Sequence, residues 1–254
     1  MIGTREWLER TGGELSRKER LAHQAGAMAA LTADLPSRFR LGRDAAGAGL
    51  RIESAPPSTD LARAATAWAE STHEPWLLRH SLRTWLFGSL LAQLDGVAAD
   101  AEALYLAGLL HDVGLTADYR IPGGDLANPC RCFAAHGAHI SEEKLLELGA
   151  SPLLASEVAG AIGMHLNAKV GTGSGATAWG VNQGAALDVV GARAADLGTR
   201  LIGDVLSRQD RTGFAEQFLA AARAEKRDRP SARMASLLGV GMGTAMRLNP
   251  LNRL

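Results

Sequence analysis

The feature that most constrains this chain is an apolar helical run that ends in two adjacent polar residues. Residues 104–110 read Leu-Tyr-Leu-Ala-Gly-Leu-Leu, and His111 and Asp112 follow at once. A C-terminal cap explains only half of the doublet, because the helix dipole favours a histidine at that end and disfavours an aspartate. An imidazole nitrogen and a carboxylate oxygen are both good ligands for zinc or iron. The doublet therefore predicts a metal site at the end of a helix.

Further residues of the same chemistry are spread along the chain. His80 lies upstream of the doublet, and His136, His165 and Asp188 follow it. Each of these residues falls on a separate predicted helix. Clustered His and Asp residues are first a metal hypothesis, so the pattern predicts a metal cage at the centre of a helical bundle.

Composition and periodicity favour an all-α fold. Alanine, leucine and arginine dominate and aromatic residues make up only 5% of the 254 residues, which favours helix over sheet. No alternating strand pattern of useful length is present. We expect residues 1–57 to form an N-terminal helical extension and linker, with the linker at 42–57. Residues 58–254 would form the bundle, with its core at about 60–200. The expected helices cover 4–34 as one or two helices, 58–70, a segment from Pro75, 100–112, 131–148, 151–165 and 181–197, with two or three more beyond and a glycine-rich loop at 168–180.

Charge and hydropathy limit the partners that we expect. The formal net charge is zero, so the chain has no overall basic character for nucleic acid or an anionic membrane. No secretory signal pattern and no run of the length that a membrane span needs is present. We therefore expect a cytoplasmic protein with a small-molecule substrate, and homodimerisation is possible. Cys130 and Cys132 are interpreted as reduced loop residues.

Two segments resemble a known family. Residues 80–84, His-Ser-Leu-Arg-Thr, and 109–116, Leu-Leu-His-Asp-Val-Gly-Leu-Thr, resemble the HD-domain superfamily of metal-dependent hydrolases. The residues beyond them are most similar to its cyanamide-hydratase-like branch. The resemblance covers about residues 60–200 and implies an all-helical bundle. It also implies four metal ligands: His80, His111, Asp112 and Asp188.

Two departures from relatives bear on metal number and substrate. Where two-metal relatives carry a further histidine, four residues before a Gly-Ala pair, this chain has Phe133, which favours one metal ion. His136 lies three residues further along, so it could still enter the pocket or lie at the surface. Many phosphohydrolases of the superfamily carry a phosphate-binding lysine where this chain has Leu115. This departure favours a small and largely neutral substrate.

The remaining polar residues have two interpretations each. His165 is either a proton donor in the pocket or a helix cap, and Thr116 could point its hydroxyl inward. Asp188 is either a ligand or a buried carboxylate bonded to an arginine such as Arg193. Arg83 pairs with a carboxylate such as Asp112 or meets an anionic substrate, and pairing is the preferred interpretation.

The sequence thus leads to a main hypothesis and three alternatives. The main hypothesis is a mononuclear enzyme, with Zn²⁺ or else Fe²⁺ or Mn²⁺, that hydrates or hydrolyses a nitrile-like, cyanamide-like or amide-like group. Its catalytic candidates are Asp112, Thr116, His136 and His165. A phosphohydrolase would instead cluster Arg79, Arg83 or Arg120 near the metal. A di-iron oxygenase would need His136 and His165 as ligands, and a catalytically silent binding domain would need no open metal position.

Overall fold

The computed structural model describes the chain except residues 34–48, 54, 122–124 and 126. Its described part is all-α, as the sequence predicts, and it contains no strand, only an isolated bridge between Glu14 and Ala232. The α-helices are α1 (Arg5–Thr11), α2 (Arg17–Ala33), α4 (Asp60–Thr72), α5 (Pro75–Asp95), α6 (Ala101–Leu110), α7 (Phe133–Glu147), α8 (Pro152–Met164), α9 (Ala176–Val190), α10 (Ala194–Arg208), α11 (Phe214–Asp228), α12 (Arg233–Gly239) and α13 (Met242–Arg247). Short 3₁₀ helices are η1 (Val113–Leu115), η2 (Thr172–Ser174) and η3 (Pro250–Arg253).

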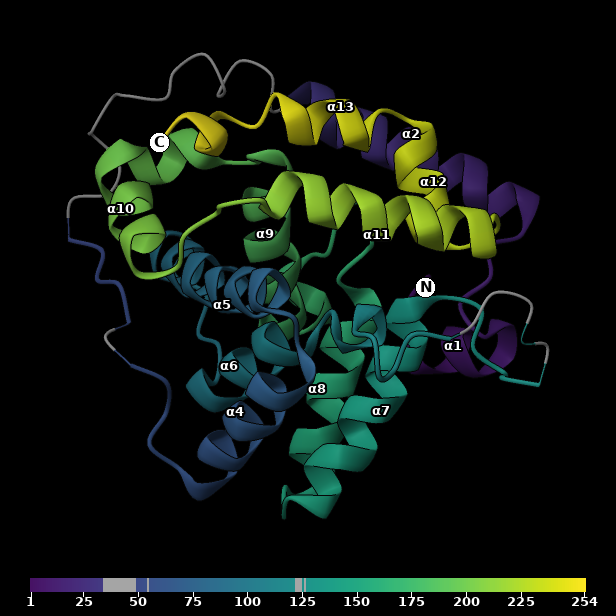
Figure 1. Cartoon of the computed structure of the whole chain (residues 1–254), viewed down its shortest axis with the longest axis horizontal. Coiled ribbons are helices and arrows are strands. Elements are labelled where there is room, and N and C mark those ends of the chain that lie inside the picture. Colours follow the sequence, from purple (N-terminus) through teal and green to yellow (C-terminus); the bar gives the residue numbers. More distant parts are fainter. Residues whose placement is uncertain (34–48, 54, 122–124, 126) are drawn as a thin grey trace.

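Helices α5 and α9 form the centre of the molecule (Figure 1). Helices α4, α6, α7 and α8 lie below this pair in the view, whereas α2, α11, α12 and α13 lie above it. Helix α6 packs on α5, α8 and α9, and its residues from Ala103 to Leu110 are all buried. The end of α6 therefore delivers the His-Asp doublet to the middle of the bundle.

Local capping explains where several helices begin. The side chains of Thr59, Asp100 and Ser151 accept hydrogen bonds from the backbone N–H groups of Ala62, Ala103 and Leu154, respectively. These side chains satisfy N–H groups that have no partner inside the helix. The helices predicted at 58–70, 100–112 and 151–165 therefore begin within two residues of the observed beginnings of α4, α6 and α8.

Helix α9 differs from the predicted boundaries. It begins at Ala176 and ends at Val190, whereas the sequence favoured a helix over 181–197 after a glycine-rich loop. Its glycines are required by packing: a Cβ at Gly184 would lie 2.0 Å from the carbonyl oxygen of Thr84 on α5, and a Cβ at Gly180 would lie 2.7 Å from Cδ1 of Leu104 on α6. Gly191 then ends the helix in a left-handed conformation, with φ of 75°. Close packing between two helices therefore overrides the weak helix propensity of glycine.

The N-terminal helices are part of the same packed structure. Helix α2 packs against α12, and His23 of α2 bonds through Nε2 to the carbonyl oxygen of Leu166 at 3.0 Å. Half of the predicted linker at 42–57 lies outside the described residues, so the domain boundary at 57 stays a prediction. Among the described helices, none is both long and apolar enough to cross a membrane.

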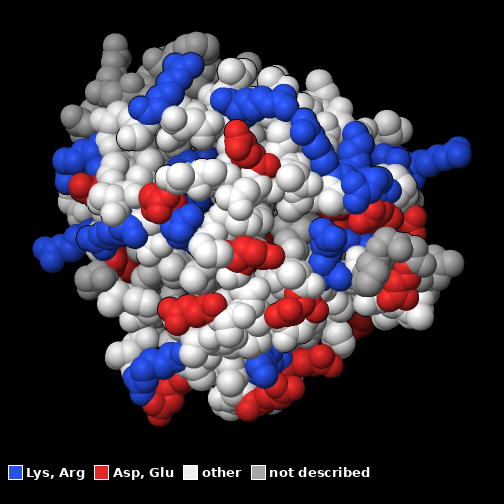
Figure 2. Space-filling model, viewed as in Figure 1, with Lys and Arg blue, Asp and Glu red and all other residues white. Residues whose placement is uncertain are grey.

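The charged side chains are mixed on the visible face of the molecule. Figure 2 shows Lys and Arg interspersed with Asp and Glu, with basic side chains more frequent along the upper part and acidic ones lower down. The whole chain contains equal numbers of the two kinds of residue, 27 each. The face therefore presents no large field of one sign.

Candidate metal centre

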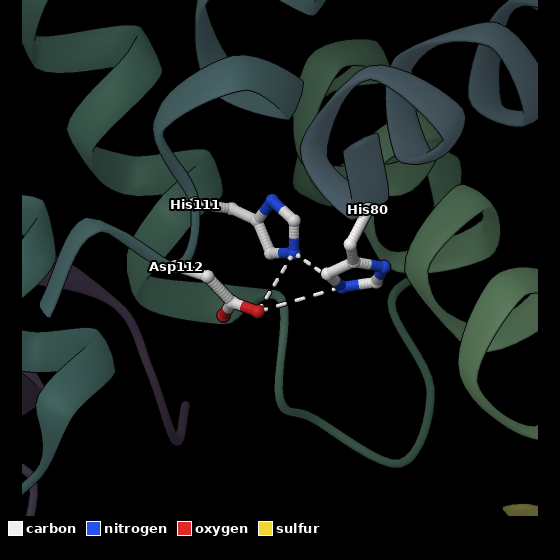
Figure 3. Close-up of side chains that lie close together, drawn as sticks. All are labelled: His80, His111 and Asp112. Atoms are coloured by element: carbon white, nitrogen blue, oxygen red, sulfur yellow. Dashed lines mark hydrogen bonds and ion pairs between the residues drawn. The ribbon is translucent and has the colours of Figure 1, made fainter. Parts of the chain in front are cut away.

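Three of the predicted ligands lie together in the centre of the bundle. His80 comes from the second turn of α5, and His111 and Asp112 come from the end of α6; their side chains point toward one another (Figure 3). One potential ligand atom from each lies within 4.8 Å of the others, and each residue is about 1% exposed. The turn after Asp112 fits against α7 because Gly114 has no Cβ, which would lie 2.3 Å from the carbonyl oxygen of Phe133.

Hydrogen bonds fix the tautomers of the histidines at this centre. The Nδ1 atom of His111 lies 2.8 Å from the carbonyl oxygen of Gly108, and that of His165 lies 2.7 Å from the carbonyl oxygen of Ile162. A carbonyl oxygen only accepts, so both Nδ1 atoms carry the proton and donate it. His80 likewise donates from Nδ1 to the ionised carboxylate of Asp188, at 2.7 Å. In each neutral ring, Nε2 is therefore left with a free lone pair.

These lone pairs converge on a carboxylate that has no hydrogen-bond donor. The Nε2 atoms of His80 and His111 lie 3.4 and 3.3 Å from Oδ2 of Asp112, and that of His165 lies 3.4 Å from Oδ1. Neither oxygen of Asp112 forms a hydrogen bond, and neither does Nε2 of His165. Buried acceptors without a donor are costly unless a cation lies among them.

A divalent metal ion fits this arrangement. The Nε2 atoms of His80 and His111 face each other at 3.2 Å, so two lone pairs repel unless a proton or a metal ion separates them. Two imidazoles and a carboxylate form a donor set that zinc and iron accept. In such sites, the ring nitrogen that does not bind the metal usually donates a hydrogen bond to a carbonyl or carboxylate oxygen, and this bond orients the histidine.

The pKa values at this centre show how strongly it favours positive charge. Burial alone would raise the pKa of Asp112, but the charge of His111 and the contacts with the His111, His165 and His80 side chains together hold this pKa well below its usual range. Burial would lower the pKa of His111, yet the charge and contact of Asp112, together with the carbonyl oxygen of Gly108 and the charge of Asp188, raise it overall. The pKa of His165 is lowered, mainly by burial. His165 is therefore neutral near pH 7, whereas Asp112 is ionised.

Asp188 lies behind His80, outside the three-residue cluster. Its carboxylate is fully buried and accepts hydrogen bonds from His80, from Nε of Arg83 at 2.8 Å and from Arg211. Its ligand role therefore stays a prediction. The expected alternative was a buried carboxylate bonded to an arginine such as Arg193, but Arg83 and Arg211 are the arginines that bind it.

Arg193 and Arg83 form ion pairs with other carboxylates than those that the sequence suggested. Arg193 contacts Asp95 and Asp196 instead of Asp188. Arg83 is fully buried and pairs with Asp188 rather than with Asp112, so structural pairing is the role that the structure supports.

A cavity of about 140 Å³ adjoins the cluster and is lined by its three residues and by His165. Phe133 packs against His165, with ring centroids 5.8 Å apart, but it does not line the cavity itself.

The structure does not bring Thr116 or His136 to the cavity. Thr116 is fully buried, and its hydroxyl donates to the carbonyl oxygen of Val113 at 2.8 Å, because the 3₁₀ turn after Asp112 places that oxygen within reach. His136 is half-buried beside Tyr119 and Arg229, so it lies outside the cavity lining. His139 is exposed and pairs with Glu143, as a surface residue.

A comparison with protein-family models agrees with this geometry. The model of the HD domain matches residues 77–232, which include all four predicted ligands and more than half of the chain. The chain belongs to the HD domain family. HD domains are generally metal-dependent hydrolases, and the cluster of His80, His111 and Asp112 could hold such a metal ion. A search of curated proteins found no match.

Sequence reasoning missed several residues that support the HD centre. Phe214 stacks on His80 with centroids 4.7 Å apart, and the guanidinium carbons of Arg83 and Arg211 lie 5.0 and 4.8 Å from the centre of the same ring. Arg211 and Phe214 lie more than 20 residues beyond Asp188, on the segment that leads into α11. No local pattern marks them, because their position depends on how α11 packs across α5.

Proposed function

We propose that this HD-domain protein is a mononuclear metal-dependent enzyme that hydrates or hydrolyses a small neutral substrate. The reacting group would be nitrile-like, cyanamide-like or amide-like. His80, His111 and Asp112 would hold one divalent ion, with Zn²⁺ preferred over Fe²⁺ or Mn²⁺. The resemblance implies Asp188 as a fourth ligand, and in the described geometry this carboxylate orients His80.

The observation that carries this proposal is the absence of basic side chains from the cavity lining. No Lys or Arg of the described residues lines it. Arg83 is bound to Asp188, Arg79 pairs with Asp210 and Arg120 is exposed, so none of the three arginines considered for phosphate binding reaches the cavity. Phosphate recognition relies on such cations, so the lining favours a neutral substrate.

A bound divalent ion would supply Lewis-acid chemistry, polarising the substrate and lowering the pKa of water. The protein's own groups would then move the protons. Oδ1 of Asp112 and Nε2 of His165 are buried acceptors without a hydrogen-bond partner, and they lie 3.4 Å apart. Either atom can accept a proton from the attacking water.

His165 is suited to return that proton to the substrate. It is neutral near pH 7 because burial lowers its pKa, and its Nδ1 proton is bonded to the carbonyl oxygen of Ile162. Nε2 therefore accepts first and donates afterwards, to the nitrogen that gains electrons as water adds to carbon. One water is consumed, and both of its protons end on the product.

The resemblance to the cyanamide-hydratase-like branch supports hydration in particular. Phe133, packed on His165, supports one ion rather than two, because it occupies the position where two-metal relatives carry a histidine. The distance of His136 from the cavity weighs against the di-iron oxygenase alternative.

Metal content and turnover of matched variants test this proposal. The purified chain is loaded separately with Zn²⁺, Fe²⁺ or Mn²⁺, and metal per chain is measured by mass spectrometry. Cyanamide, small nitriles, small amides and phosphate esters are then screened as substrates. We expect about one ion per chain and turnover of a nitrile or an amide. His111→Ala should lose both metal and turnover, whereas His139→Ala, a change at an exposed histidine, should keep both.

Three results would overturn the proposal in different ways. Undiminished turnover by a metal-free His111→Ala variant would remove the metal from the reaction. Release of phosphate without hydration would favour the phosphohydrolase. Two ions per chain would favour the two-metal alternative.

A further inference from the structure

The cavity beside the cluster extends well beyond the three candidate ligands. Its lining comes from α2, from the second half of α9, and from α12 with the residues around it, all far apart in sequence. Ala30 of α2 is exposed, and Leu31 is partly exposed, which places the mouth of the cavity at this end of α2. Ala27, one turn earlier, is buried at 5% exposure and lines the deeper part. The candidate metal centre thus lies at the inner end of a path from the surface.

The walls of this path are apolar. Beyond the cluster and His165 they consist of Ala, Val, Leu, Met and Phe side chains with two asparagines. The side-chain amide of Asn182 donates to the carbonyl oxygens of His165 and Asn167, at 2.9 and 2.8 Å. The amide of Asn167 donates to the carbonyl oxygen of Ile2 at 2.7 Å. These donors are therefore engaged with backbone rather than offered to a ligand.

An apolar cavity of this size favours hydrocarbon over water. Engineered apolar cavities of about 150 Å³ stay dry and bind benzene. Water in the cavity beside α2 would find hydrogen-bond partners only near the cluster, since the walls offer so few. A small hydrophilic substrate such as cyanamide would leave most of the cavity unfilled.

We propose that the substrate carries a short hydrocarbon chain, which occupies this cavity while its polar group reaches the cluster. This inference rests on the proposed function and adds the substrate class to it. Ala27 provides room along the inner wall, and Leu237 of α12, partly exposed, lies near the outer part. These two residues determine the length of chain that the cavity accepts.

Binding of a homologous series of inhibitors tests the inference without any need for turnover. Straight-chain acyl hydroxamic acids, from acetyl to octanoyl, bind divalent metal ions through a constant head group. Their affinity for the metal-loaded full-length chain is measured by calorimetry, with metal content checked afterwards. Each added methylene should tighten Kd by about fourfold until the cavity is full, after which the affinity should level off.

Matched variants locate the chain within the cavity. In Ala27→Leu, the affinity should level off at a shorter hydrocarbon chain. The longest hydroxamic acids that the unmodified protein accepts should bind at least about tenfold more weakly, because the new side chain fills the volume that they occupy. Acetohydroxamate should bind as before. Ala29→Leu adds the same volume to the exposed side of α2 and should change nothing. In Leu237→Ala, the affinity should keep rising up to longer hydrocarbon chains before it levels off. This variant provides a second test if Ala27→Leu folds poorly.

The outcomes separate this inference from the proposed function. If acetohydroxamate binds but affinity is independent of chain length, the hydrocarbon inference is wrong and the metal centre stands. The hydrocarbon inference would also be refuted if Ala27→Leu and Ala29→Leu changed the affinity for the long-chain hydroxamic acids equally. If the chain retains no metal ion after loading and binds no member of the series, the metal centre fails and the proposed function fails with it.

Discussion

His73 lies at the C-terminal end of α4, and its buried imidazole should make the stability of the fold depend on pH. The side chain is 6% exposed, Nδ1 lies 3.1 Å from the hydroxyl oxygen of Thr72, and Nε2 has no hydrogen-bond partner. Burial lowers its pKa to about 4, with a further lowering by the charge of His111. Asp112 and the carbonyl oxygen of Ala69 oppose this shift but do not cancel it.

The magnitude follows from the difference between folded and unfolded states. In the unfolded chain His73 titrates near the ordinary value of about 6.5. Above that pH it is neutral in both states and has no effect on stability. As the pH falls from about 6.5 to about 4, the unfolded chain binds a proton that the folded chain does not. A pKa difference of this size lowers the free energy of unfolding by about 3 kcal/mol over that range.

The assay compares His73→Asn with the unmodified protein. Free energies of unfolding are measured by urea denaturation at pH values from about 7 to about 4, with a chelator present so that no metal ion binds the adjacent cluster. Asparagine can keep the contact with Thr72 but does not titrate. The stability of the unmodified protein should therefore fall by about 3 kcal/mol more than that of the variant.

A surface control separates this effect from general acid denaturation. His139→Asn removes an exposed histidine and should leave the pH dependence of the unmodified protein almost unchanged. Parallel curves for the unmodified protein and His73→Asn would refute the reasoning, because they would show that His73 titrates alike in both states.

Two further predictions concern packing and buried charge. Gly184→Ala should destabilise the fold by about 1–3 kcal/mol or more, because its Cβ would lie 2.0 Å from the carbonyl oxygen of Thr84. Gly160→Ala is the control, because no atom lies within 4 Å of a Cβ at this position. This change should be neutral or stabilise the fold by up to about 1 kcal/mol. Equal thermal midpoints for these two variants would contradict the close contact of α5 and α9. Glu225→Gln should cost about 3–5 kcal/mol in urea unfolding, because it leaves the guanidinium of Arg229 buried without its carboxylate. A cost below about 1 kcal/mol would show that this pair is not essential.

Short-range patterns account for most of what was predictable. The caps at Thr59, Asp100 and Ser151 act within three residues, so the sequence marks the beginnings of these helices. The doublet of His111 and Asp112 was conspicuous because polar groups at the end of an apolar helix need a reason. The all-α class was confirmed, and the HD family was predicted from two short motifs.

Contacts between distant segments account for what was missed. Gly180 falls in the predicted glycine-rich loop, yet it lies inside α9, where a Cβ would lie 2.7 Å from Cδ1 of Leu104 on α6; Gly184 lies against the backbone of α5. Thr116 and His136 seemed suited to the site by spacing, but the turn after Asp112 and the direction of α7 keep them away from the cavity. Arg211 and Phe214 reach Asp188 and His80 only through the packing of α11.

The sequence by itself determined that the chain is helical and that His80, His111 and Asp112 are its most suggestive metal-binding residues, because capping and periodicity act over a few residues. The tertiary structure alone decided which lone pairs meet, which arginines neutralise Asp188 and which helices enclose the cavity. Those outcomes depend on packing between segments that no spacing rule connects. The helix that walls the cavity near its mouth, α2, lies more than 40 residues before the first candidate ligand.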